Sequence, residues 1–428
     1  MDATRLLQHL IRLDTVNPPG NERPAQELLA GVLMEAGFDV VLDGRTHERP
    51  NLVATLGGGD GPTLGLLSHV DTVLANPEEW RHGPWSGDLA DGCVWGRGAL
   101  DMKSQTAAEV AAAVGLAHGG WRPNGTLKVI AVADEETGGA EGARWLCANR
   151  PDLARCDYLL NEGAGAVIPF DGRRVYDVCI AEKGTFRFRI VAEGVAGHAS
   201  MPKIGDNALL KLAPLLQAMA ERQPGYDLTD GPRALLEGLG VGPIADGDPE
   251  PALKRLVEKD PALGVLVEPM LGVTLAPTMV EASEKINVLP SRAVLTVDCR
   301  VPPGLGEDVA RARVEEVLGT DGYRLEFLEM VVGNASPVES PLMDLIRDWV
   351  GEREPAAAVV PTILPGFTDS RTWRDAFPDC VAYGFFPHAH QTTHEVAPLI
   401  HSADERIDVR DLELATDFFT YAARRILA

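Results

Sequence analysis

Short apolar segments alternate with helix-like segments through the first part of the chain, and this alternation limits the possible folds more than any other feature. Residues 102–118 and 139–149 have the apolar spacing of helices. Strands separated by helices are typical of an α/β fold, in which a mostly parallel sheet is sandwiched by helices. The predicted strands cover residues 51–56, 63–69, 126–133 and 157–161.

The glycine-rich segment 57–61 separates the first two predicted strands. It leads into a strand and not into the N-terminus of a helix, which a phosphate-binding loop requires. We therefore expect a hairpin turn at this position. The lack of a glycine-rich loop that opens a helix also argues against a nucleotide-dependent enzyme.

From about Gly184 the pattern changes to that of an inserted ferredoxin-like α+β domain. Residues 185–193 alternate strictly between apolar and polar, as a half-exposed strand does. Further strands are predicted at 271–278, 293–301 and 323–332, and helices at 206–221 and 306–318, on either side of a Gly/Pro/Asp-rich stretch at 223–252. Because 428 residues exceed one ordinary core, we expect a catalytic domain in two parts, 1–183 and 334–428, around a lid domain at 184–333.

The charge balance excludes some partners. Lys and Arg number 39 against 63 Asp and Glu, a net charge of −24. Such a surface repels phosphate backbones and anionic membranes, so we expect no nucleic acid and no membrane as partner. The six cysteines are scattered singly, no segment has the apolar core of a signal peptide, and no apolar run approaches the roughly 20 residues of a membrane span. We expect a cytoplasmic protein.

Acidic residues and a histidine stand where the predicted parallel strands end. Ligands of open α/β sheets collect outside these carboxyl ends. His69 and Asp71, two apart on an extended segment, point the same way, which suits an imidazole that binds metal and is held by a carboxylate. The full set is His69, Asp71, Asp101, Glu135, Glu136 and Glu162.

Each of these residues also has an ordinary structural explanation. His69 and Asp71 suit a strand end that is polar by chance. Asp101 suits a helix N-cap, Glu135 and Glu136 suit the first turn of a helix, and Glu162 suits a solvated turn. Late in the chain, composition alone does not choose a ligand among the histidines His388, His390, His394 and His401.

Charge counting favours a metal centre for the combination. Two divalent ions carry four positive charges, which three carboxylates and one bridging hydroxide balance, with two neutral imidazoles completing the shells. Asp101, Glu136 and Glu162 with His69 and one later histidine supply this set. Glu135 is then left as a free carboxylate, which is the base that a metal-activated water needs.

At these residues the chain resembles the co-catalytic zinc peptidase and deacylase family, which includes acetylornithine deacetylase, succinyl-diaminopimelate desuccinylase, glutamate carboxypeptidase and aminoacylase. Matching segments follow in family order across almost the whole chain. They are S-H-V-D-T-V (68–73), W-G-R-G-A-L-D-M-K (95–103), V-A-D-E-E-T-G-G (132–139), N-E-G (161–163), G-H-A-S (197–200), K-I-N-V-L-P (285–290), D-C-R (298–300), G-F-T-D-S-R (366–371) and H-S-A-D-E-R-I (401–407).

The resemblance implies two metal ions, zinc or alternatively cobalt or manganese, with Asp101 bridging them. One ion is held by His69, Asp101 and Glu162, and the other by Asp101, Glu136 and His401, because only His401 precedes the Asp-Glu-Arg stretch of the family motif. The resemblance also makes Glu135 the general base and later the proton donor to the leaving amine, and it makes Asp71 the residue that orients His69.

In the lid, the resemblance implies that His198 and Asn287 stabilise the oxyanion, in the family often across a dimer interface. We therefore expect a homodimer formed through the lid. Arg300 and Arg371 are candidates for binding a substrate carboxylate, since a guanidinium group matches it bidentately. The ordinary explanations are an exposed loop histidine, a turn asparagine, and arginines paired with surface acids.

The expected activity is hydrolysis of the amide bond of an N-acyl amino acid or small peptide with a free carboxylate, through a metal-bridging water activated by Glu135. A dipeptidase or carboxypeptidase of the same family is the alternative within this class. Arg371 and the long stretch at 223–268 resemble the aminoacylase and carboxypeptidase-S branches. The alternative from another class is a metal-binding relative without catalysis, and the intact Glu135 argues against it.

Overall fold

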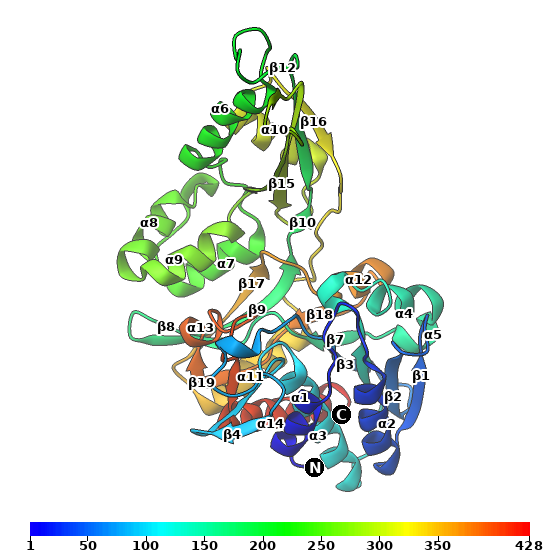
Figure 1. Cartoon of the computed structure of the whole chain (residues 1–428). Helices are drawn as coiled ribbons and strands as arrows, with labels where there is room; N and C mark the ends of the chain where they lie inside the picture. Colours follow the sequence, from blue (N-terminus) through cyan, green and yellow to red (C-terminus); the bar gives the residue numbers. More distant parts are fainter. The chain divides into compact units, whose positions relative to one another are not determined.

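The computed structural model describes all 428 residues, which form two compact units. Unit 1 contains Met1–Ile180, Ser336–Thr362 and Thr368–Ala428, and unit 2 contains Ala181–Ala335 and Ile363–Phe367. None of the helices combines the length and the apolar character needed to cross a bilayer. Each unit has its own sheet and its own layer of helices (Figure 1).

The central sheet of unit 1 has ten strands, and its middle strands run parallel. These are β6 (Thr126–Val132), β3 (Thr63–His69), β7 (Tyr158–Asn161) and β18 (Val381–Gly384). The outer strands, several of them antiparallel, are β1 (Asp39–Asp43), β2 (Asn51–Gly57), β9 (Arg173–Glu182), β8 (Ala166–Phe170), β19 (His388–Thr392) and β17 (Ala358–Leu364). The predicted α/β fold class is confirmed.

The predicted hairpin at 57–61 is wrong. β2 and β3 do not pair with each other, because β6 lies between them, antiparallel to β2 and parallel to β3. The glycine-rich segment crosses the start of β6 instead, where Gly58 N donates to Gly125 O (3.2 Å) and Gly61 N to Asn124 O (3.0 Å). Gly57 and Gly58 have positive φ values (105° and 126°), which this crossing needs and which glycine adopts without strain.

Helices cover the sheet of unit 1. α3 (Lys103–His118) packs against β3 and β6 and is covered in turn by α1 (Ala3–Arg12), α2 (Arg23–Glu35) and α14 (Val409–Ile426). Its alanine-rich surface is buried on nearly every side, and the buried residues include polar ones such as Gln105 and Glu109. A separate apolar cluster joins the sheet to α4 (Ala143–Asn149) and α12 (Asp369–Ala376).

Unit 2 has the ferredoxin-like order that the sequence predicts. Its antiparallel sheet follows the order β16 (Arg324–Phe327), β11 (Phe188–Glu193), β15 (Arg292–Val301) and β13 (Thr274–Glu281), with β10 (Gly184–Thr185) beside β15. α6 (Ala208–Glu221) and α10 (Glu307–Leu318) pack on one face, around Phe186, Phe188, Ile190 and Leu295. The stretch after α6 forms three further helices, α7 (Asp230–Leu239), α8 (Glu250–Lys259) and α9 (Pro261–Val267).

Candidate metal centre

The candidate ligands of unit 1 meet at the carboxyl end of its parallel strands. His69 is the last residue of β3, Glu162 follows β7, and Glu135 and Glu136 lie in the short 3-10 helix η2 (Glu135–Thr137) after β6. Since β3 pairs in parallel with both β6 and β7, these three strand ends are neighbours at one edge of the sheet. The helix predicted at 139–149 begins only at Ala143, because Gly138 and Gly139 have positive φ values (103° and 70°).

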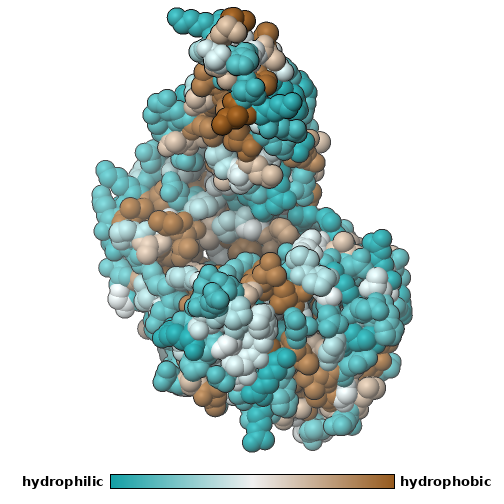
Figure 2. Space-filling model, in the orientation of Figure 1, coloured by the Kyte–Doolittle hydropathy of each residue, from teal (hydrophilic) through white to brown (hydrophobic).

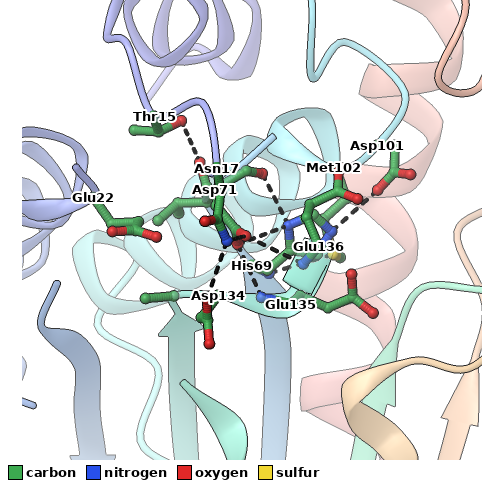
Figure 3. Close-up of polar contacts among 12 residues, drawn as sticks. Thr15, Asn17, Glu22, His69, Asp71, Asp101, Met102, Asp134, Glu135 and Glu136 are labelled. Carbon is green, nitrogen blue, oxygen red and sulfur yellow. Dashed lines mark hydrogen bonds and ion pairs between the residues drawn. The ribbon is translucent and has the colours of Figure 1, made fainter. Parts of the chain in front are cut away.

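Asp101 lies between two imidazoles, one on each oxygen of its carboxylate. Its Oδ1 is 3.0 Å from His69 Nε2, and its Oδ2 is 3.1 Å from His401 Nε2. Figure 3 shows Asp101 beside His69, close to Glu135 and Glu136. A carboxylate placed in this way is suited to bridging two ions, each with its own histidine.

Two further carboxylates flank this central group. Glu136 Oε2 is 3.2 Å from His401 Nε2, and Glu162 Oε1 is 3.6 Å from His69 Nε2. The ligand atoms of His69, Asp101 and Glu136 lie within 4.8 Å of one another, as do those of His69, Glu135 and Glu162. The buried Oε1 of Glu136 has no hydrogen-bond partner. Nitrogen and carboxylate donors crowded around an unsatisfied buried oxygen fit divalent ions such as zinc.

The protonation of these groups reflects burial and mutual repulsion. Burial raises the pKa of Glu162 well above its ordinary value, and the nearby Asp101 adds to the effect. Burial also favours the neutral form of Asp101, but hydrogen bonds from His401 and His69 outweigh it, and the pKa of Asp101 is lowered. Hydrogen bonds to Asp101 and Glu136 raise the pKa of His401 to about 10. Carboxyl groups therefore outnumber the two imidazoles at this site, which suits the binding of cations.

Asp71 connects His69 to the turn that carries Glu135. Its carboxylate accepts the backbone N–H groups of Glu135 and Glu136, each at 3.2 Å (Figure 3). His69 Nδ1 is 3.4 Å from Asp71 Oδ1 and 3.0 Å from the backbone oxygen of Asp71. Both contacts suit an Nδ1–H donor, which leaves Nε2 for a metal.

Asn17 is a polar contact of this site that the sequence analysis missed. Its Nδ2 group donates to Asp71 Oδ2 (2.9 Å) and to Asp134 Oδ1 (3.1 Å), and it is buried (Figure 3). Asp134 is further held by Arg49, at 3.0 Å. In the sequence, Asn17 stands before Pro-Pro-Gly and indicates only a turn. Nothing local shows that the turn reaches the strand ends.

The predicted lid residues His198 and Asn287 are neighbours in unit 2. β12 (Gly197–His198) pairs with β14 (Val288–Leu289), and Ala199 N donates to Asn287 O (3.0 Å). Both residues are exposed, and Ser200 Oγ lies 2.7 Å from His198 Nδ1. The structure thus brings together two residues that are far apart in the sequence.

Arg300 is already paired within unit 2. Its Nε donates to Asp298 Oδ1 (2.7 Å), and Asp298 also accepts from Arg187 Nε (2.9 Å). One nitrogen of Arg300, NH1, is buried without a hydrogen-bond partner. Arg371 lies on α12 in unit 1, where its Nε is 3.9 Å from Asp375. Neither arginine's role in substrate binding is tested by these contacts.

A sequence profile described as "Peptidase family M20/M25/M40" matches residues 65–425, which is most of the chain. The chain belongs to this peptidase family. The resemblance predicted from the motifs is confirmed, and with it the general class, a metallohydrolase.

Individual similar proteins support this assignment. The chain is 29% identical over 413 residues to a succinyl-diaminopimelate desuccinylase of Paracoccus denitrificans, and the match covers 95% of the chain and 93% of that protein. It is 26% identical over 379 residues to a probable carboxypeptidase S-like protein of Dictyostelium discoideum, covering 83% and 70%. Its fold matches a metallo-carboxypeptidase of Sulfolobus solfataricus, with a TM-score of 0.73, 17% identity, and coverage of 100% and 99%.

Proposed function

We propose that the protein hydrolyses the amide bond of an N-acyl amino acid or small peptide with a free carboxylate, using two divalent ions, with zinc as the first choice. The position of Asp101 between His69 Nε2 and His401 Nε2 carries this proposal. In it, Asp101 and His69 with Glu162 hold one ion, and Asp101 and His401 with Glu136 hold the other. When bound, the ions would polarise the scissile carbonyl and make a water molecule acidic.

Glu135 is the proposed general base. It is 9% exposed, and its carboxylate lies within 4.8 Å of the ligand atoms of His69 and Glu162. In the proposed assignment Asp101 completes the ligands of that ion, which leaves Glu135 free. Burial raises the pKa of Glu135 well above its ordinary value, and Glu162, Asp369 and Asp101 raise it further. Bound cations would lower this pKa, and the resulting carboxylate could accept a proton from water and later return it to the leaving amine. The intact base favours an enzyme over a relative that only binds metal.

Unit 2 is the proposed lid. His198 and Asn287, paired through β12 and β14, are the proposed donors to the oxyanion. Arg300 is the proposed ligand of the substrate carboxylate, since its buried NH1 has no partner within the chain. The pairing with Asp298 fixes its guanidinium group, so little side-chain entropy is lost on binding.

The proposed active unit is a homodimer formed through unit 2. β13 is an edge strand whose residues from Ala276 onward are exposed, including Met279 (58%) and Val280 (50%). Exposed apolar side chains also occur around β12 and along α6, namely Val195, Met201, Ile204, Leu209 and Leu210. Hydrophobic surface is visible at the top of Figure 2, in the part of unit 2 that carries these two elements. An exposed strand edge beside apolar surface is suited to pairing with a second copy.

A substrate panel tests the proposed activity. We expect the purified protein to cleave N-acyl amino acids, including N-succinyl compounds, or dipeptides, and to lose activity with a chelator and regain it with zinc, cobalt or manganese. Preferential cleavage of dipeptides would favour the peptidase alternative, which the carboxypeptidase S-like relative supports. Activity that survives complete metal removal would overturn the proposal. The cytoplasmic location stays part of this proposal, supported by six cysteines that form no disulfide.

A further inference from the structure

Glu405 is a buried acid that the proposed mechanism does not use. It lies four residues after His401, and its side chain is 0% exposed. Its partner Arg97, 3% exposed, donates from NH1 to Glu405 Oε2 at 2.6 Å. Both residues belong to segments that resemble family motifs, but neither is a candidate metal ligand.

The other carboxylate oxygen of Glu405 contacts the backbone of the segment that carries Asp101. Oε1 accepts the N–H of Leu100 at 2.7 Å and the N–H of Asp101 at 3.0 Å. One oxygen therefore fixes the main chain at Asp101 itself, and the second is held by Arg97. A carboxylate that accepts backbone N–H groups in a buried site forms strong, charge-assisted hydrogen bonds.

Backbone pairing joins the same two segments. β20 (Arg406–Asp408) pairs antiparallel with β5 (Cys93–Trp95), and β4 (Asp88–Ala90) completes this small sheet. Gly96 N donates to Glu405 O at 3.0 Å. The chain that leads out of β5 reaches Asp101, and the chain that leads into β20 comes from His401. Asp101 and His401, about 300 residues apart in the chain, are therefore both connected to the same small sheet.

We propose that Glu405 is the positioning residue that holds Asp101 in register with His401, and so sets the affinity of the ion that these two residues share. This inference rests on the metal assignment of the proposed function. The backbone of Asp101 is fixed by Glu405 Oε1, while His401 is tied to Glu405 through the chain itself. Loss of the acceptor oxygen frees the main chain at Asp101 and loosens its carboxylate from His401. The other ion, which Asp101 also holds, keeps the support of His69 and Glu162 and is expected to be affected less.

Two double variants isolate the acceptor oxygen. Arg97→Met with Glu405→Leu removes both charges of the buried pair, an exchange for apolar groups of similar size that proteins often tolerate. Arg97→Met with Glu405→Gln is equally uncharged but keeps an amide oxygen that can accept the N–H groups of Leu100 and Asp101. Glu405→Asp is a second route to the same loss, because it keeps the charge but shortens the side chain. Asp404→Asn is the control in the same loop, since Asp404 binds Arg81 on the surface.

The readout is metal content and affinity, without substrate. Each protein is freed of metal, folding is checked by circular dichroism and thermal unfolding, and the protein is then titrated with Zn²⁺ against a competing chelator. We expect two ions in the wild type, in the Asp404→Asn control and in the Gln double variant. In the Leu double variant and in Glu405→Asp we expect the ion shared by Asp101 and His401 to bind about 10- to 100-fold more weakly, as is typical for the loss of a group that orients a metal ligand. The ion held with His69 and Glu162 is expected to weaken less, because two of its ligands are unaffected.

Equal affinities in the folded Leu and Gln double variants would overturn the inference, because the acceptor oxygen would then have no part in metal binding. This holds whether the two double variants both keep the affinity of the wild type or both lose the ion to the same extent. A wild type that binds no pair of ions would instead overturn the proposed function. The two failures are therefore distinguishable in one titration.

Discussion

Glu135 shows how position decides the role of a single carboxyl group at this site. Asp71 holds its backbone, while Asp101, Glu162 and Asp369 surround its side chain with negative charge. These neighbours and burial favour the protonated acid in the protein without metal. Two divalent cations nearby would reverse this balance and favour the carboxylate. In the proposed mechanism, Glu135 is therefore a competent base only when both ions are bound.

Replacing Glu135 by Gln tests this role. The amide has nearly the shape of the acid but does not take up a proton, so we expect both metal ions to stay bound and stability to change little. Turnover is expected to fall by a factor on the order of 10² to 10⁴, as for a lost general base. Steady-state kinetics with elemental analysis of the bound metal measures both. Near-normal turnover with full metal content would show that another group is the base.

Arg300 is the residue expected to select a free carboxylate. Arg300→Ala is expected to lower kcat/KM for an N-acyl amino acid by about one to two decades, the cost of roughly 1.5–3 kcal/mol for a lost charge-assisted hydrogen bond. It is expected to change little for the same compound with its carboxylate amidated, which the wild type cleaves poorly. Arg187→Ala is the matched control, because Arg187 shares Asp298 but is 42% exposed. A selective loss in Arg371→Ala alone would assign the carboxylate to Arg371.

Among the elements, α3 combines an almost fully buried surface with a buried acid. Glu109 is 0% exposed and accepts a hydrogen bond from Gln105 Nε2 at 2.9 Å. Burial raises the pKa of Glu109 to about 8, above its ordinary value of 4.5. The folded protein therefore keeps a proton that the unfolded chain releases above its own pKa. The stabilisation that this group gives is fully present at low pH and is lost as the pH rises toward 8.

Glu109→Gln is expected to remove this pH dependence, because the amide is uncharged like the protonated acid. Between about pH 5 and 8, the wild-type free energy of unfolding is expected to fall relative to that of the variant by about 1.4 kcal/mol per pH unit. Urea unfolding at several pH values, with chelator present throughout, measures the difference. The exposed Glu35→Gln on α2 is the control and should follow the wild type. Parallel curves for wild type and Glu109→Gln would mean that Glu109 is not a buried neutral acid.

The elements themselves were predictable to different degrees. The strand predicted at 63–69 is β3 to the residue, and the helices at 102–118 and 306–318 begin one residue later than predicted. These elements have strong local periodicity. Strand order was not predictable in this way, because an apolar segment does not show which other strand it pairs with. The position of β6 between β2 and β3 was therefore missed. The helices α7 to α9 were missed because glycine and proline suggested an irregular stretch.

At the scale of the whole molecule, the candidate site could be assembled from the sequence because family motifs join residues that local patterns leave separate. The resemblance implies that His69 and His401 are ligands, which stays a prediction, but only the fold shows Asp101 between them. Asn17 and Glu405 were missed as contacts because each acts through backbone or carboxylate groups distant in sequence. Their effect depends on three-dimensional placement, which single-sequence spacing does not contain.

The proposed dimer gives the prediction that involves the whole assembly. His198 is exposed on unit 2 in a region rich in exposed apolar side chains, which a second copy would cover. If it acts on the partner's site, chains with His198→Ala and chains with Glu135→Ala are each inactive alone but complement each other when mixed. Each mixed dimer then contains one site with an intact base and an intact partner histidine. We expect recovery of up to about a quarter of wild-type activity after subunit exchange, because about half of the dimers are mixed and half of their sites are complete.

Native mass spectrometry of differently tagged chains confirms the exchange, and two batches of the same variant, mixed in the same way, give the background. Exchange without recovery would place His198 in the site of its own chain or outside catalysis.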